Sequence, residues 1–148
     1  MNYRKFGESI YVRFDKGDEI ISGIINICKK EKILSAVYSG IGGCSDVTVG
    51  TLVPETNEFL EHKKSGVMLE MISLNGNISS DYNNNIEHHT HAMFSFLDEN
   101  KEQKFIGGHL LETTVSYTAE IEIKPVQNGV IRRKQDELTG ITVWDFSS

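Results

Sequence analysis

The sequence predicts an α+β domain in which a mainly antiparallel, barrel-like β-sheet of about seven to nine strands carries one principal α-helix. Two observations predict this class. Short runs of alternating apolar and polar residues, typical of strands with one buried face, recur along the chain between turn-forming residues. Only one segment has the 3.6-residue period of a helix. With 148 residues, of which 39% are hydrophobic, the chain can bury one core, so we expect a single domain over residues 1–148.

The first half of the chain contains the predicted helix. Its apolar positions 20, 21, 24, 25 and 28 lie on one face of a helix over residues 19–31, and lysines near its end suit the negative pole. Asp15 and Asp18 offer carboxylates at the helix start. Strands are predicted at residues 9–14, 33–38, 46–53, 57–64 and 67–74.

Two glycine-containing segments need separate interpretation. Residues 39–43 follow a strand, but no Gly-Lys-Ser/Thr and no helix pattern follow them, so we reject a phosphate-binding loop. These glycines are expected at a turn or bulge between strands. Asn75-Gly76-Asn77 is predicted as a turn, and residues 79–85 as a polar loop.

The second half of the chain predicts strands only. Residues 91–97 and 104–111 form a hairpin around a polar turn at 98–103, and residues 113–124 have period-two character up to Pro125. The tail has two short apolar runs around the charged turn at 136–140.

Four of the five histidines lie between positions 88 and 109. Residues two apart in a strand share a face, so His89 and His91 are neighbours. If the hairpin turn is centred on Asn100, opposed positions sum to 200, and His91 lies directly opposite His109. An odd register would turn His109 to the other face and remove the triad.

Three imidazoles on one face suit a divalent metal, which His nitrogens bind at about 2.0–2.1 Å. The spacing leaves a second interpretation equally open, a hydrogen-bonded polar cluster at a subunit contact. His88 should face the other way, and His62 is expected at the surface.

Composition narrows the classes of function. Lys and Arg total 15 against 21 for Asp and Glu, so the net charge of −6 does not provide the positive surface of a DNA-binding protein. The cluster Arg132-Arg133-Lys134 is expected to be a solvated strand or helix end. Cys28 and Cys44 suggest free thiols in a reducing compartment. Residues 1–8 lack the apolar region of a signal peptide, and no run approaches the roughly 20 apolar residues of a membrane helix, so we expect a cytoplasmic protein.

Several motifs, taken in order, resemble the plant and prokaryote conserved (PPC) domain in its stand-alone prokaryotic form. They lie between about Tyr11 and Phe146, at residues 39–42, 69–78, 89–92 (His-Thr-His-Ala), 106–110 (Ile-Gly-Gly-His-Leu) and 118–121. The resemblance implies a compact α/β fold, a homotrimer and a divalent metal held by His89, His91 and His109. In plants this domain follows AT-hooks in nuclear DNA-binding proteins. The AT-hook core, Arg-Gly-Arg-Pro, does not occur in this sequence, so the minor-groove element of those proteins is missing.

These observations favour a metal-binding domain whose biochemical activity is unknown. Zinc is the first choice, and iron, nickel or manganese remain open because three histidines select weakly. Whether the chain is an enzyme is left open. Glu70, Glu112 and Glu120 are the carboxylates nearest the motifs and the candidates for a general base. The alternatives are a DNA-binding or regulatory protein, and a trimeric module that binds a small ligand without catalysis.

Overall fold

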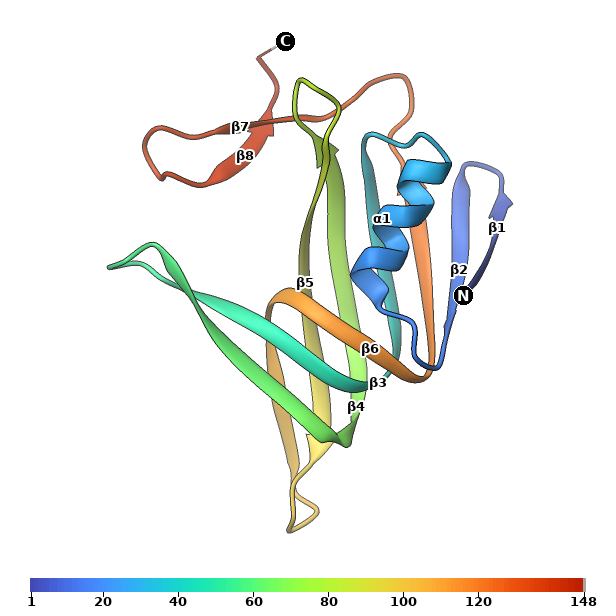
Figure 1. Ribbon diagram of the computed structural model, residues 1–148, viewed down its shortest axis with the longest axis vertical. Coiled ribbons are helices and arrows are strands. Elements are labelled where there is room, and N and C mark those ends of the chain that lie inside the picture. The colour runs from blue at the N-terminus through green and yellow to red at the C-terminus, as the bar shows by residue number, and fades with distance from the viewer. Residues whose placement is uncertain (148) are drawn as a thin grey trace.

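Eight strands and one helix are arranged as one sheet with the helix on one face (Figure 1). The computed structural model describes residues 1–147. The elements are β1 (Asn2–Phe6), β2 (Ser9–Asp15), α1 (Ile20–Lys30), β3 (Ala36–Val53), β4 (Glu58–Ser80), β5 (Ile86–Leu97), β6 (Gln103–Pro125), β7 (Arg132–Gln135) and β8 (Thr142–Asp145). The sequence therefore predicted the single helix and the mainly antiparallel sheet correctly.

The sheet has the strand order β1-β2-β6-β3-β4-β7-β8, and β5 pairs with both β4 and β6. All ladders are antiparallel except the parallel contact of β4 with β7 at Ser80 and Arg132. The four long strands pair in a circuit from β3 through β4, β5 and β6 back to β3. The strand order nevertheless has two ends, β1 and β8, in place of the barrel-like form that we expected.

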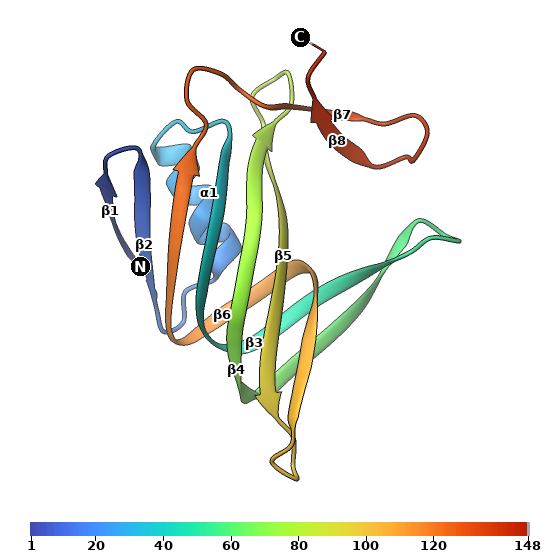
Figure 2. The same ribbon diagram turned by 180° about the vertical axis from the view of Figure 1, so that it is seen from behind.

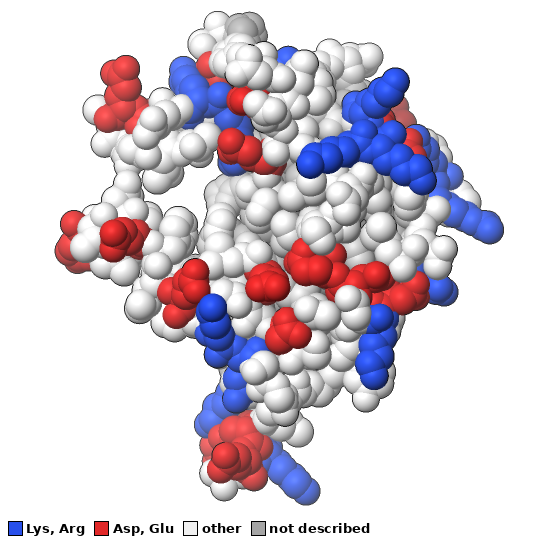
Figure 3. All heavy atoms as spheres, in the orientation of Figure 1, with Lys and Arg blue, Asp and Glu red and all other residues white. Residues whose placement is uncertain are grey.

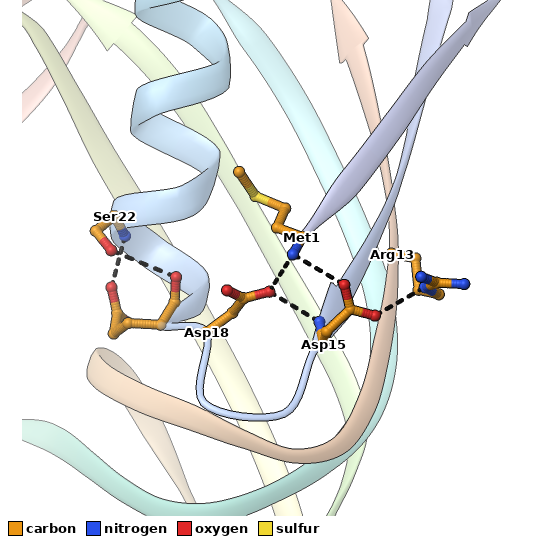
Figure 4. Close-up of polar contacts among 6 residues, drawn as sticks. Met1, Arg13, Asp15, Asp18 and Ser22 are labelled. Carbon is orange, nitrogen blue, oxygen red and sulfur yellow. Dashed lines mark hydrogen bonds and ion pairs between the residues drawn. The ribbon is translucent and has the colours of Figure 1, made fainter.

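Acidic side chains organise the start of α1 (Figure 4). The N-cap is Glu19, whose carboxylate accepts hydrogen bonds from two backbone amides of the first turn, including that of Ser22 at 2.6 Å. Asp15 and Asp18, predicted at the helix start, instead hold the N-terminal amine of Met1 at 2.9 and 2.7 Å. The helix start is thus tied to the end of β2 and to the chain terminus.

One side of α1 is buried against the sheet. Its buried residues are Ile20, Ile21, Gly23, Ile24, Ile27 and Cys28. They join the alternate residues of β2, β3, β4, β5 and β6 in one hydrophobic core. Figure 2 shows the opposite face of the sheet, which no helix covers. Both cysteines are buried and free, as their spacing predicted.

Two strands are longer than the sequence suggested. The predicted turn at residues 75–77 is wrong, because β4 continues through it and Gly76 pairs with Thr90. A Cβ on Gly76 would lie 2.5 Å from the ring of Tyr38, so the glycine makes room for that ring. Residues 40–43 lie inside β3, where register shifts confirm the bulge and exclude the turn.

The two ends of the chain differ in how well they were predicted. The tail forms the hairpin of β7 and β8, in line with its two short runs around a turn. Strand β1 was missed because four of its five residues are exposed and only Tyr3 reaches the core. No helix within residues 1–147 is long and apolar enough to cross a lipid bilayer.

Candidate metal centre

Strands β5 and β6 bring three histidines together. His91 pairs directly with His109, as the sum of 200 predicted, and His89 lies two residues before His91 on the same face. The ring centroid of His89 lies 5.2 Å from the ring centroids of His91 and of His109. The centroids of His91 and His109 are 5.5 Å apart. The predicted triad is therefore assembled.

The donor set fits one divalent ion. One ring nitrogen from each histidine can be chosen so that all three lie within 4.8 Å of one another. Tetrahedral ligands at a zinc–nitrogen distance near 2.0–2.1 Å would be about 3.4 Å apart. Small side-chain rotations would close that difference, since His89 and His91 are exposed and His109 is half-buried. Three neutral nitrogens also leave coordination positions for a ligand.

The histidines lie at the wall of a cavity of about 710 Å³. One side is formed by residues 50–52, 57 and 59, which belong to the bent outer part of the β3–β4 hairpin, here called the β3–β4 arm (residues 46–65). The other side is the β7–β8 hairpin (residues 132–145), through residues 133 and 140–142. Asn57 and Gly140 approach each other where the two tips meet. Figure 3 shows the opening that the arm and the hairpin enclose.

Close backbone packing positions His109. Gly108 has φ +154°, and a Cβ there would lie 2.7 Å from the carbonyl oxygen of Gly50, so β6 approaches β3 more closely than a side chain would permit. The ring of Phe59, from the β3–β4 arm, lies 5.0 Å from the His109 ring at an angle of 35°. His109 is thus held between its own strand and an aromatic side chain of the arm.

Electrostatics favour the neutral form of His89 and His109. Burial, followed by the neighbouring His89 and His91, lowers the pKa of His109 to about 4. Burial and the nearby His91 also lower the pKa of His89. The charge of Arg133 lowers both pKa values further. Neutral imidazole is the form that binds a metal, so these shifts favour coordination.

A buried polar network lies behind the triad. Thr90, between His89 and His91 in β5, points to the other face and is fully buried. Its hydroxyl lies 2.5 Å from the Tyr38 hydroxyl and 2.9 Å from Nδ1 of His88. His88 therefore faces away from the triad, as predicted. The network joins β5 to β3 beneath the site.

The remaining candidate residues lie elsewhere. Glu70 and Glu120 are exposed and line a different groove, together with Ile41, Ile72 and Tyr117. Glu112 is exposed on β6, and none of the three carboxylates lines the histidine cavity. A catalytic role for them stays a prediction. His62 is exposed on β4, as expected.

Arg133 is the site residue that sequence reasoning missed. We expected it in a solvated basic cluster, but only 8% of its side chain is exposed, and it lines the histidine cavity. Arg132 is also half-buried, and its Nη1 donates to Ser80, Asn84 and the Asp81 carbonyl. Those bonds fix the start of β7 beside the end of β4. Only the folded structure, in which Arg133 lines the histidine cavity, shows that the β7–β8 hairpin reaches this cavity.

Solved structures of the same fold include proteins from three organisms. A plant- and prokaryote-conserved protein from Pyrococcus horikoshii is 30% identical, with a TM-score of 0.78 over 97% of this chain and 94% of its own. A metal-containing protein from Archaeoglobus fulgidus is 25% identical, with a TM-score of 0.81 over 97% of this chain and 98% of its own. A candidate DNA-binding protein from Bacteroides thetaiotaomicron is 25% identical, with a TM-score of 0.85 over 99% and 98%.

The family model extends this likeness to sequence patterns. No curated protein matches the chain. The model of the Plants and Prokaryotes Conserved (PCC) domain matches residues 1–127, a span that contains all three histidines of the triad. This is the family to which the motifs of the sequence point. The chain belongs to the Plants and Prokaryotes Conserved domain family.

Proposed function

We propose that this chain is a divalent-metal-binding domain in which His89, His91 and His109 hold one ion. The observation that carries the proposal is the convergence of three ring nitrogens within 4.8 Å at the wall of a cavity. Zinc is the first candidate, with iron, nickel or manganese as alternatives. The metal-containing relative from Archaeoglobus fulgidus supports the assignment. When bound, such an ion polarises a ligand oxygen and makes bound water more acidic.

Elemental analysis of protein purified without a His-tag tests the proposal. We expect close to one ion per chain in the wild type, and much less in each of His89→Ala, His91→Ala and His109→Ala. His62→Ala is the matched control, because His62 is exposed on β4 outside the triad. Unchanged metal content in the three triad variants would disprove the ligand set.

Catalysis and simple ligand binding are separable alternatives at this site. The structure places no Asp or Glu side chain among the cavity-lining residues within 1–147, so a general base from this chain is not part of the proposal. Turnover of esters, phosphoesters and amides, measured with and without a chelator, distinguishes an enzyme from a ligand-binding module. Chelator-sensitive turnover would identify an enzyme.

We also propose that the chain assembles as a homotrimer through the face of the sheet that α1 leaves uncovered. Exposed apolar side chains on this face include Ile41 (59% exposed), Ile72 (47%) and Met93 (48%). Burying what remains exposed of each would contribute roughly 1 kcal/mol. Met93 shares the face of His89 and His91, so the assembly would bring the metal site close to a subunit boundary.

Sedimentation analysis tests the assembly. Ile72→Glu should dissociate the trimer, because a carboxylate would be buried without a partner. Leu138→Glu is the control, since Leu138 is 95% exposed in the turn between β7 and β8. A monomeric wild type, or equal behaviour of the two variants, would contradict the proposal.

A DNA-binding function is the second alternative, because the relative from Bacteroides thetaiotaomicron is described as a candidate DNA-binding protein. The charges argue against it. The net charge is −6, and Figure 3 shows a band of acidic side chains across one face. Counterion release makes even non-specific DNA binding visible at low salt. A gel shift with duplex DNA at low salt, lost as salt is raised, would support this alternative.

A further inference from the structure

Arg133 of the β7–β8 hairpin has a buried charge that the protein pairs incompletely. Its side chain is 8% exposed, and its Nε has no hydrogen-bond partner among the residues that the structure describes. Its Nη1 lies 3.6 Å from a carboxylate oxygen of Glu87, whose side chain is 53% exposed. That distance is longer than a direct charge-assisted hydrogen bond, which is about 2.7–2.9 Å.

A buried guanidinium that is incompletely paired requires a further partner. Native proteins pair nearly all buried polar groups, and a buried charge is costly unless it is both paired and hydrogen-bonded. Glu87 does not supply this, because its carboxylate is largely in solvent and does not reach Nε. An anion that enters the cavity beside Arg133 would balance the guanidinium charge that Glu87 pairs only at a distance.

The cavity itself is suited to an anion. Arg133, His88 and the three histidines of the triad line it together, whereas no Asp or Glu of residues 1–147 does. A divalent ion on the histidines would add positive charge facing the same space. Phe59, Leu52 and Ile141 give the remaining wall apolar surface. Apolar walls with a few converging polar groups are typical of sites for small molecules.

We propose that the cavity binds a small organic oxyanion, a carboxylate or a phosphate ester, whose anionic group pairs with the guanidinium of Arg133. Its other end would reach the open coordination positions beside His89, His91 and His109. The second contact rests on the proposed metal site, whereas the contact with Arg133 does not depend on it. The apolar residues would contact the body of the molecule.

Nuclear magnetic resonance titration of ¹⁵N-labelled protein tests the proposal, because the Nε–H signal of an arginine is observed directly. The probes are acetate, inorganic phosphate and, as the neutral isostere of acetate, acetamide. In the wild type, acetate or phosphate should shift the Arg133 Nε–H signal, and acetamide should not. The stronger of the two anions identifies the class of ligand.

Four variants make the test specific, and their anion binding is followed by the backbone amide signals of the cavity-lining residues, because Gln and Lys have no Nε–H group. Arg133→Gln should weaken anion binding by about 10- to 100-fold, the effect expected from one hydrogen bond to a charged group. Arg133→Lys keeps the charge without Nε and should fall between this variant and the wild type. Glu87→Gln breaks the ion pair but leaves the guanidinium, so it should bind anions as well as the wild type or better. Lys134→Gln removes an equal charge from an exposed neighbour in β7 and should have no effect.

The outcomes separate this inference from the metal proposal. Thermal unfolding and metal content are measured on every sample, and if Arg133→Gln does not fold, Arg133→Lys carries the comparison. No anion binding by the wild type, or equal binding by the wild type and the Arg133 variants, overturns the inference even if metal content is normal. Equal losses in Lys134→Gln and Arg133→Gln also overturn it. If the purified wild type contains no metal but binds anions through Arg133, the result supports this contact and refutes the metal proposal.

Discussion

The hydrogen-bond network behind the triad should stabilise the fold as a unit. Thr90 is fully buried and Tyr38 is 4% exposed, and the Thr90 hydroxyl contacts both Tyr38 and His88. Burial raises the pKa of Tyr38 to about 12 and lowers that of His88, so the network is neutral near pH 7. Thr90→Val keeps the shape of the side chain but removes its hydroxyl. The Tyr38 hydroxyl and Nδ1 of His88 then lose the hydroxyl that both contact.

The magnitudes follow from counting those groups. A buried polar group left unpaired costs about 1–3 kcal/mol, so Thr90→Val should destabilise the protein by roughly 2–3 kcal/mol. Tyr38→Phe removes one partner but leaves Thr90 bonded to His88, and should cost only about 1 kcal/mol. The double variant should cost less than the sum of the two, because Thr90→Val no longer leaves a buried phenol unpaired.

Urea denaturation of the wild type, both single variants and the double variant measures these free energies. Thr56→Val is the matched control, since Thr56 is exposed in the turn between β3 and β4 and its replacement should change stability by less than about 0.5 kcal/mol. Additive effects of the two single variants would refute the shared network. A cost for Thr90→Val no larger than that of the control would refute the assignment of a buried partner.

Four further outcomes are expected. Zinc at about 100 times its dissociation constant should stabilise the wild type by about 2.7 kcal/mol. The measurement is the melting temperature, which should rise. A similar rise in His91→Ala would contradict the ligand set. Because the pKa of His109 is lowered to about 4, its neutral form persists below the ordinary value of 6.5. Metal content after dialysis should therefore fall as the pH is lowered toward 4, and metal retained at pH 3 would indicate other ligands. The same shift should make the metal-free protein lose stability as pH falls from about 6.5 toward 4, which acid titration of the fold measures. Gly76→Ala should lower the free energy of unfolding by about 1–3 kcal/mol, because its Cβ would overlap the Tyr38 ring. Gly129→Ala is the control and should change it little, since a Cβ there would have nothing within 4 Å. Equal melting temperatures of the two variants would argue against the overlap.

The triad could be predicted because each step in its derivation is local. Alternation along β5 places His89 and His91 on one face, and a short hairpin turn fixes the partner of His91. The helix was equally accessible, since its apolar spacing follows directly from the helical period. Such inferences need no knowledge of distant residues.

The errors arise where a distant contact overrides a local preference. Gly76 is flanked by asparagines, which favours a turn, yet it lies within β4 because the Tyr38 ring occupies the place of a side chain. Strand β1 has little apolar character and is held by pairing with β2. Arg133 looks like a surface charge because its neighbours in sequence are basic, and only the path of the β7–β8 hairpin buries it. None of these contacts has a signal in the adjacent sequence.

The walls of the histidine cavity come from two parts of the chain, of which the family model matches only the first. The triad and the β3–β4 arm lie within residues 1–127, the span that the family model matches, whereas Arg133 and residues 140–142 lie beyond it. Substitutions in the C-terminal hairpin can therefore alter what enters the cavity while the histidine-bearing strands stay unchanged. Two proteins with the same histidine triad could in this way differ in their ligands. For a related protein, the residues after the matched span are the ones to compare before a ligand is transferred to it.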